Sequence, residues 1–137
     1  MFNLARPSPS GIMNKRILTL SALLGALAVV LGAFGAHALK SMISPEALEN
    51  WKTAVNYQFI HVLALFGLSL MPENRLVKAA SWCFGLGILF FSGSLYLLSL
   101  REIADLPLSV LGPITPLGGL LFIVAWFLLF LLGLKKN

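Results

Sequence analysis

Residues 17–39 read ILTLSALLGALAVVLGAFGAHAL, an apolar run of more than 20 residues without Asp, Glu, Lys or Arg. A helix needs about 20 such residues to cross a hydrocarbon core about 30 Å thick. Three further stretches come close to that length. The sequence therefore predicts an all-α fold, an integral membrane four-helix bundle with spans at residues 17–39, 53–71, 79–100 and 116–134.

The composition agrees with a membrane protein. Of the 137 residues, 58% are hydrophobic and 11% are charged, and the mean hydropathy is +0.91, whereas a water-soluble domain needs more charge to cover its surface. The net charge of +5 does not indicate a nucleic-acid partner, because the basic residues form short clusters that border the apolar runs. Anionic lipid headgroups explain these clusters. The single cysteine, Cys83, lies inside an apolar run and is interpreted as a packing residue.

The chain divides into a tail and one domain. Residues 1–16, with two prolines among small polar residues, are predicted to be a flexible cytoplasmic tail, and residues 17–137 to form a single four-helix transmembrane domain. Ser44-Pro45-Glu46 combines a capping hydroxyl, a first-turn proline and an acid. The second helix should therefore begin with interfacial turns at residues 45–52, with Trp51 at the level of the lipid headgroups. Thr115 before Pro116 predicts the start of the last helix.

The positive residues predict the orientation, because short cytoplasmic loops are enriched in Lys and Arg. Seven of them flank the spans on one predicted side and three on the other, which places both termini and the middle connector in the cytoplasm. The seven are Arg6, Lys15, Arg16, Arg75, Lys78, Lys135 and Lys136, and the three are Lys40, Lys52 and Arg101.

The first apolar run also resembles a secretory signal that would be cleaved near Ala38. Apolar segments of signal peptides run about 7 to 15 residues and this one is longer, so the first helix is expected to remain uncleaved. Translation could start at Met1 or at Met13, and neither choice changes the predicted bundle.

Small residues predict the faces on which the helices meet, because membrane helices associate through close backbone approach and interhelical hydrogen bonds. The third helix should present Ser81 and Gly85 on the face that carries Ser92. On the second helix, Val55, Phe59, Val62 and Phe66 oppose a polar stripe and are expected to face lipid. The glycines expected at helix contacts are Gly25, Gly32, Gly35, Gly85, Gly118 and Gly119.

A polar cluster is predicted in the outer half of the bundle. Its candidate members are His37, Tyr57, Gln58, His61, Ser92, Tyr96 and Thr115. An ionisable group inside a membrane is a candidate functional site, so His61 could relay a proton or hold a polar ligand. The alternative is that these side chains join helices through hydrogen bonds worth about 0.6 to 2 kcal/mol each. Helical rise puts His37 and His61 about 10 Å apart in depth, which disfavours a shared haem, and no cofactor or metal is predicted.

The chain resembles a known family over nearly its whole length after the tail. The motifs that carry the resemblance, in order along the chain, are Gly32-Ala33-Phe34-Gly35-Ala36-His37, Trp51-x-Thr53 with Tyr57-Gln58-x-x-His61, Phe91-Ser92-Gly93-Ser94-Leu95-Tyr96 and Thr115-Pro116-Leu117-Gly118-Gly119. They are similar to the signatures of a family of small membrane proteins of unknown function that includes bacterial YgdD and eukaryotic transmembrane protein 256. The resemblance implies a four-helix inner-membrane protein and supplies no activity, substrate or cofactor.

The predicted function is that of a structural or accessory component of the inner membrane, not an enzyme, because every acidic residue lies in a connector and no catalytic arrangement can be proposed. The expected partners are the lipid bilayer and either further copies of the chain or a larger membrane complex. The alternative is a small transport or ligand-binding protein that uses a pocket lined by Tyr57, His61, Ser92 and Tyr96.

Overall fold

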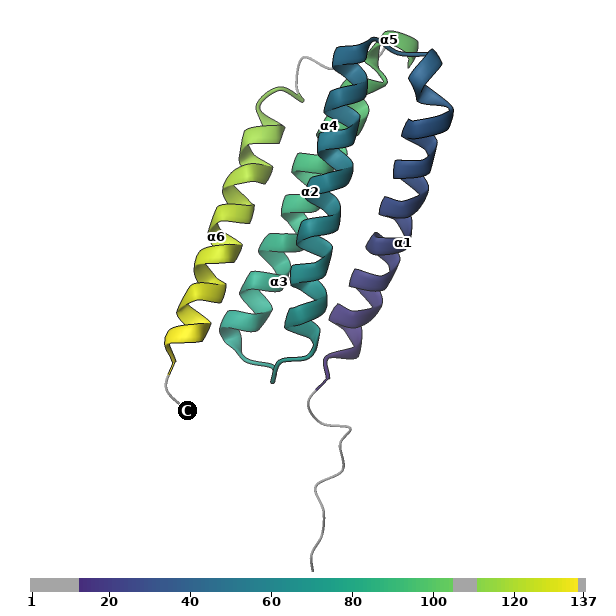
Figure 1. Cartoon of the computed structure of the whole chain (residues 1–137). Coiled ribbons are helices and arrows are strands. Elements are labelled where there is room, and N and C mark those ends of the chain that lie inside the picture. Colours follow the sequence, from purple (N-terminus) through teal and green to yellow (C-terminus); the bar gives the residue numbers. More distant parts are fainter. Residues whose placement is uncertain (1–12, 105–110, 136–137) are drawn as a thin grey trace, which may run out of the picture.

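The computed structural model describes residues 13–104 and 111–135, and all regular structure in these residues is helical. Four long rods lie side by side (Figure 1). The first two rods are α1 (Lys15–His37) and α2 (Pro45–Ser69), and the last is α6 (Ile114–Leu134). The third rod is built from α3 (Arg75–Gly87), a π-helical turn η3 (Ile88–Ser92) and α4 (Gly93–Ser99). Two short elements, the 3₁₀ turn η2 (Leu39–Ser41) and α5 (Arg101–Ala104), lie near one end of the bundle.

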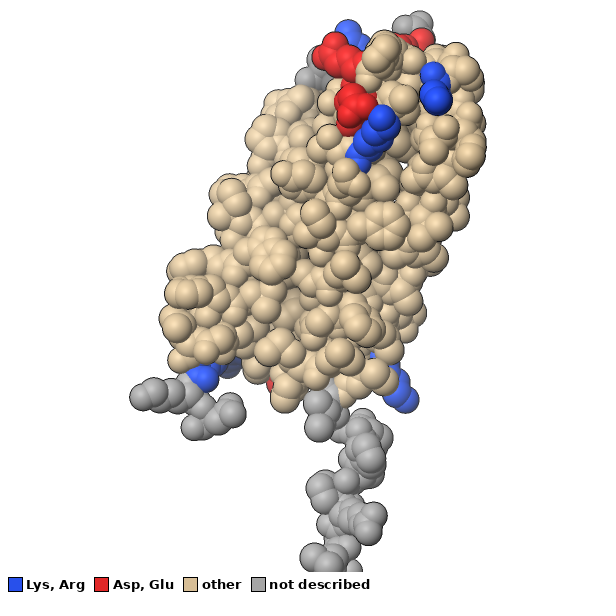
Figure 2. Space-filling view, in the orientation of Figure 1, with Lys and Arg blue, Asp and Glu red and all other residues tan. Residues whose placement is uncertain are grey.

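Three of the four rods are long and apolar enough to cross a membrane, judged by length and composition: Lys15–Ser41, Arg75–Ser99 and Ile114–Leu134. The rod α2 is not among them; its first turns carry charged residues, and its middle carries the polar residues Asn56, Gln58 and His61. Figure 2 shows the charged side chains gathered at the two ends of the molecule, with uncharged residues covering the side between them. The prediction of an all-α membrane protein is confirmed, and the crossing of α2 remains a prediction.

The helix starts follow local capping chemistry. Ser44 caps α2 by accepting the N–H of Ala47 at 3.2 Å, with Pro45 in the first turn, as the sequence predicts. Asn14 caps α1 through N–H groups of the first turn, so that helix begins at Lys15, inside the predicted tail of residues 1–16. Residues 1–12 lie outside the described residues. The prediction that Thr115 caps the last helix is wrong, because α6 begins at Ile114 and its N-cap position is Pro113.

At the end of the bundle that holds η2 and α5, a carboxylate joins two elements. The Ser44 hydroxyl donates to Glu102 Oε1 at 2.6 Å, and the Ser44 main-chain N–H donates to Glu102 Oε2 at 2.9 Å. These donors hold the pKa of the Glu102 carboxyl below its ordinary value. The residue that starts α2 is thereby tied to α5.

In the α1–α2 contact, glycines of α1 alternate along the helix with bulky side chains of α2 that pack against them; we call this series of contacts the ladder. A Cβ atom placed on Gly25 would lie 3.4 Å from Val62, and one placed on Gly32 would lie 3.4 Å from Val55. Both valines are buried, so the prediction that they face lipid is wrong; of the same predicted face, Phe66 is exposed. The physical reason is that the glycines leave hollows along α1, and close packing requires side chains from the facing helix to fill them.

Trp51 fills the third hollow of this ladder. Its indole lies where a Cβ atom on Gly35 would stand, 2.5 Å from that position, and the side chain is 3% exposed. The indole ring is inclined against Tyr96, with ring centroids 4.6 Å apart. The Trp51 ring is therefore enclosed by α1 and α4, and its depth at the level of the headgroups remains a prediction.

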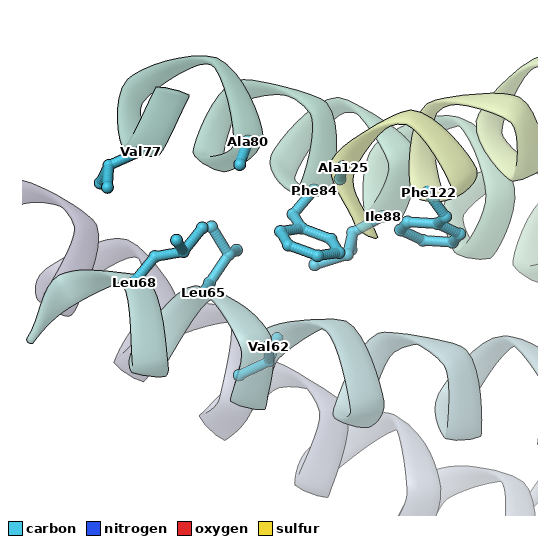
Figure 3. Packing of buried hydrophobic residues seen from close by; sticks show 9 residues of the cluster. All are labelled: Val62, Leu65, Leu68, Val77, Ala80, Phe84, Ile88, Phe122 and Ala125. Atoms are coloured by element: carbon cyan, nitrogen blue, oxygen red, sulfur yellow. The ribbon is translucent and has the colours of Figure 1, made fainter. Parts of the chain in front are cut away.

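The second seam joins the third rod to α6 around Phe84. A Cβ atom on Gly118 would lie 2.8 Å from the Phe91 Cα, and the Phe122 ring occupies the hollow beside Gly87. Figure 3 shows the apolar core along this seam, with Phe84 and Phe122 between the backbones. The buried residues of this core are Val62, Leu65, Leu68, Val77, Ala80, Phe84, Ile88, Phe122 and Ala125.

The π turn η3 changes which residues of the third rod are buried. A π turn holds one residue more than an α turn, so the residues on either side of it are rotated relative to a straight helix. Ala80 and Phe84 are fully buried on the same rod as Ser92, whereas Ser81 and Gly85 are half-buried. The prediction that Ser81 and Gly85 share an interior face with Ser92 assumed an uninterrupted α-helix and is wrong.

The Gly118 contact predicts a specific sensitivity to one added methyl group. Gly118→Ala should lower the free energy of unfolding by about 1 to 3 kcal/mol, because the new Cβ meets Phe91 backbone atoms that cannot turn away. Gly133→Ala on the same helix is the control, since its Cβ would have no neighbour within 4 Å. Thermal unfolding of both variants in detergent measures the difference, and equal stability would contradict the seam.

Candidate functional site

The centre of the predicted polar cluster is Gln58, which links three rods. Its side chain is 1% exposed. The amide Nε2 donates to the Leu24 carbonyl of α1 at 2.8 Å, and the amide Oε1 accepts from the Tyr96 hydroxyl of α4 at 2.8 Å. Because the Gln58 amide and the Tyr96 hydroxyl would otherwise be unpaired inside the bundle, the three residues form a hydrogen-bonded tie between α1, α2 and α4.

A second tie of the same kind lies seven residues earlier on α2. The Trp51 indole N–H donates to the Leu31 carbonyl of α1 at 2.8 Å. Carbonyl oxygens have two lone pairs, so Leu31 can accept this bond beside its helical one. Trp51 is a polar contact that the sequence did not assign to the cluster. The sequence signal for Trp51 was its spacing from Gln58, because residues seven apart lie on the same face of a helix. Their acceptors, Leu31 and Leu24, are also seven residues apart.

Two serines of the third rod are held by further hydrogen bonds. Ser92, which is fully buried, donates to the Ala54 carbonyl of α2 at 2.8 Å. Ser94, which was not among the predicted residues, lies 2.6 Å from the Thr115 hydroxyl of α6. Thr115 therefore contacts α4 and not the Gln58 group.

His61 lies between α2 and α6 on the other side of the bundle. Its Nδ1 is 2.6 Å from the Tyr57 carbonyl, and because a carbonyl can only accept, Nδ1 carries the proton. The imidazole stacks on Phe122, with ring centroids 3.5 Å apart and planes at 4°. With Tyr57, Phe91 and Trp126 it lines a hollow of about 580 Å³. The Nε2 atom has no hydrogen-bond partner among the described residues.

The structure thus divides the predicted cluster. Gln58 and Tyr96 line a groove beside α1, whereas Tyr57 and His61 line the hollow beside α6. The cause is helical geometry, since successive residues on α2 point about 100° apart and Tyr57 and Gln58 are neighbours. A pocket shared by Tyr57, His61, Ser92 and Tyr96 is not formed.

The remaining predicted residues are placed as follows. His37 is the last residue of α1, is exposed, and is not brought to the cluster. Gly25, Gly32, Gly35 and Gly118 lie at helix contacts. Gly119 and Gly85 are less tightly packed, with nearest side-chain atoms 3.8 Å and 3.9 Å from their Cβ positions, and Gly85 lines the groove beside α1.

These features define a helical multi-pass membrane protein whose rods are joined by small residues and buried hydrogen bonds. The family model described as "Protein of unknown function (DUF423)" matches residues 31–119. The chain belongs to this DUF423/UPF0382 family of membrane proteins of unknown function, which confirms the resemblance seen in the sequence.

Relatives from several bacteria support this membership. The chain is 41% identical to the UPF0382 membrane protein YwdK of Bacillus subtilis (strain 168) over 125 residues, covering 88% of this chain and 98% of the relative. It is 38% identical to a UPF0382 membrane protein of Haemophilus influenzae over 116 residues, covering 83% and 90%. No solved structure matches.

The Gln58 tie predicts that the two tyrosines of the chain are not equivalent. Tyr96→Phe should lower the free energy of unfolding by about 1 to 2 kcal/mol, because the buried Gln58 oxygen loses its donor. Tyr57→Phe is the control, since Tyr57 is 40% exposed and its hydroxyl has no partner among the described residues. Thermal unfolding in detergent gives the comparison, and a larger loss for Tyr57→Phe would refute the tie.

Proposed function

We propose that the chain is a non-enzymatic structural or accessory component of the bacterial cytoplasmic membrane. One observation carries the proposal: among the described residues, every fully buried side-chain nitrogen and oxygen atom has a hydrogen-bond partner within the chain, and the unpartnered Nε2 of His61 is not one of these fully buried atoms. Such a network stabilises one arrangement of the helices. A group that acts on a substrate must instead have a donor or acceptor left for it.

The proposal includes four membrane crossings, with α2 as the fourth. Its middle carries Gln58 and His61, whose side chains are buried against α1 and α6 and not against lipid. Polar side chains inside a membrane are tolerated where they face neighbouring helices. The charged first turns of α2, with Glu46, Glu49 and Lys52, lie at one end of the bundle, where α2 begins (Figure 1).

The orientation follows from the charges at the two ends. The starts of α1 and α3 and the end of α6 lie at one end of the bundle (Figure 1) and carry, among the described residues, Lys15, Arg16, Arg75, Lys78 and Lys135 with one acid, Glu73; the opposite end mixes Lys40, Lys52 and Arg101 with acidic residues. The excess of Lys and Arg favours the first end as the cytoplasmic one, with both termini there. Self-association or docking on a larger complex belongs to the same proposal.

A reporter that is active only in the cytoplasm tests this topology. Fusions at Asn137 and near Glu73 should be active, and fusions near Glu49 and Asp105 should be inactive, because the last two sites lie at the opposite ends of the spans. Activity at Glu49 would refute the crossing or the orientation. Loss of residues up to Ala38, seen by mass spectrometry of the mature protein, would show instead that the first helix is a cleaved signal.

The second candidate function is ligand binding or proton transfer at His61. It is favoured by the Nε2 atom of His61, which has no partner among the described residues, and by the hollow that His61 lines with Tyr57 and Trp126. A neutral imidazole in such a place could accept a proton or a hydrogen bond from a small polar molecule.

Replacement of the two histidines separates the candidates. If His61 only packs helices, His61→Leu should stay inserted and lose at most about 2 kcal/mol of stability, since its hydrogen bond is to a carbonyl of its own helix. His37→Leu, at the exposed end of α1, is the matched control. The measurements are thermal unfolding and complementation of a strain that lacks the gene. A stable His61→Leu protein that fails to complement, beside a His37→Leu protein that succeeds, would favour the second candidate.

A further inference from the structure

The rod α1 packs along α2 and leaves a groove on its other side, between itself and the third rod. The groove has a volume of about 690 Å³. Its walls are leucines of α1 and apolar residues of α3 and η3, among them Leu20, Leu24 and Leu27 opposite Trp82, Leu86 and Leu89. Several of these side chains are largely exposed, including Leu20, Leu27, Trp82 and Leu89. The groove is therefore a lateral opening lined with hydrocarbon.

One end of the groove is basic. Arg16 and Lys78 line it there, together with Glu73 and Asn14. The Glu73 carboxylate accepts a hydrogen bond from the Asn14 side chain at 2.7 Å. Within residues 13–104 and 111–135 the one ion pair is Lys52–Glu49, at the opposite end of α2, so neither Arg16 nor Lys78 has a carboxylate within 4.0 Å. The two cations outnumber the one carboxylate, so the net charge at this end of the apolar groove is positive.

The groove runs from Arg16 to Leu31 on α1, about 22 Å along the helix, and is therefore deep enough for an acyl chain of one leaflet. Leu24, whose carbonyl holds the Gln58 amide, lies eight residues beyond Arg16 on α1, or about 12 Å along the helix. One leaflet of a hydrocarbon core about 30 Å thick is about 15 Å deep. An amphiphile with its charge at Arg16 therefore has its chain beside the leucines and reaches the level of Gln58 and Tyr96.

We propose that this groove binds one anionic phospholipid, with its phosphate on Arg16 and Lys78 and an acyl chain between α1 and α3. The chain enters sideways from the bilayer, and the two basic side chains select the negative headgroup. Basic pockets between membrane helices bind anionic lipid headgroups in this way. The site goes beyond the proposed structural role and does not depend on which end of the bundle is cytoplasmic.

Lipid competition on the full-length protein tests the headgroup site. The protein is reconstituted in discs of equal parts phosphatidylglycerol and phosphatidylcholine, released into mild detergent, and weighed by native mass spectrometry. One phosphatidylglycerol should be retained in preference to phosphatidylcholine. The double variant Arg16→Gln, Lys78→Gln should reduce that preference about 30-fold, since each basic residue near a lipid surface contributes about fivefold. The control Arg75→Gln, Lys135→Gln removes the same charge and should keep the preference.

A second pair of variants tests the chain site. Gly85→Leu places a side chain in the groove beside Leu20, where a Cβ atom has its nearest neighbour at 3.9 Å, and should reduce retention of both lipids at least tenfold. Gly67→Leu on α2, where a Cβ atom has no neighbour within 4 Å, is the control and should retain the lipid. Thermal unfolding confirms that each variant is folded.

Four results would overturn the proposal. The first is equal retention of the two lipids by the parent protein, and the second is an equal loss in the two double variants. The third is release of the bound phospholipid by millimolar inorganic phosphate, which would show a free-phosphate site instead of a lipid site. Cross-linking of two copies through a cysteine placed at Leu89 would show that a second chain, and not a lipid, covers the groove.

Discussion

Two side chains of α2 donate hydrogen bonds to carbonyl oxygens of α1, and the arrangement of the other helices depends on this pairing. Trp51 bonds to Leu31 and Gln58 bonds to Leu24, seven residues apart on each antiparallel helix. These donors can reach the α1 backbone because the helices approach closely, with glycines facing Val55 and Val62. With α1 fixed on α2, the Tyr96 hydroxyl can donate a hydrogen bond to Gln58, and this bond holds α4 beside the α1–α2 contact.

The two sides of α2 have different characters as a result. Toward the third rod and α6 the contact is filled by aromatic and branched side chains around Phe84, and the π turn sets Ser92 against the α2 backbone. Toward α1 the contact follows one stripe of small residues on α1. A helix held along one stripe leaves its other side uncovered, and this is where the leucine groove lies.

Much of the architecture could be predicted from the sequence because it depends on local chemistry and on length. The apolar runs predict the positions and lengths of the long helices. Ser44 and Pro45 predict the start of α2, and the glycines of α1 mark its contact face. The errors arose where the packing partner decides the outcome. Val55 and Val62 were assigned to lipid because bulky apolar residues are stable there, and only the hollows opposite them make burial more favourable.

Two other errors have similar causes. The π turn at Ile88–Ser92 leaves no periodic signal in an apolar run, so the rotation that exposes Gly85 to the groove could not be read from spacing. For the candidate site, residue types identified the polar side chains correctly as a group, but adjacent positions such as Tyr57 and Gln58 diverge on a helix. Which of them meet is decided by the neighbouring rods. The hydrogen bond of Trp51 to α1 was not predicted, because tryptophan is enriched at membrane interfaces and Trp51 was assigned there.

The direction of the α1–α2 hydrogen bonds has a consequence for biosynthesis. A ribosome makes α1 before α2, so the carbonyl acceptors at Leu24 and Leu31 already exist in a formed helix when Trp51 and Gln58 leave the exit tunnel. In the proposed four-crossing topology, the less apolar helix therefore enters the bilayer beside a partner that can pair its polar groups at once, and the two can insert as a hairpin. The remaining acceptor, Gln58 Oε1, can be paired only after Tyr96, 38 residues further along the chain, has been synthesised. The third rod therefore packs onto this hairpin after α1 and α2 have paired.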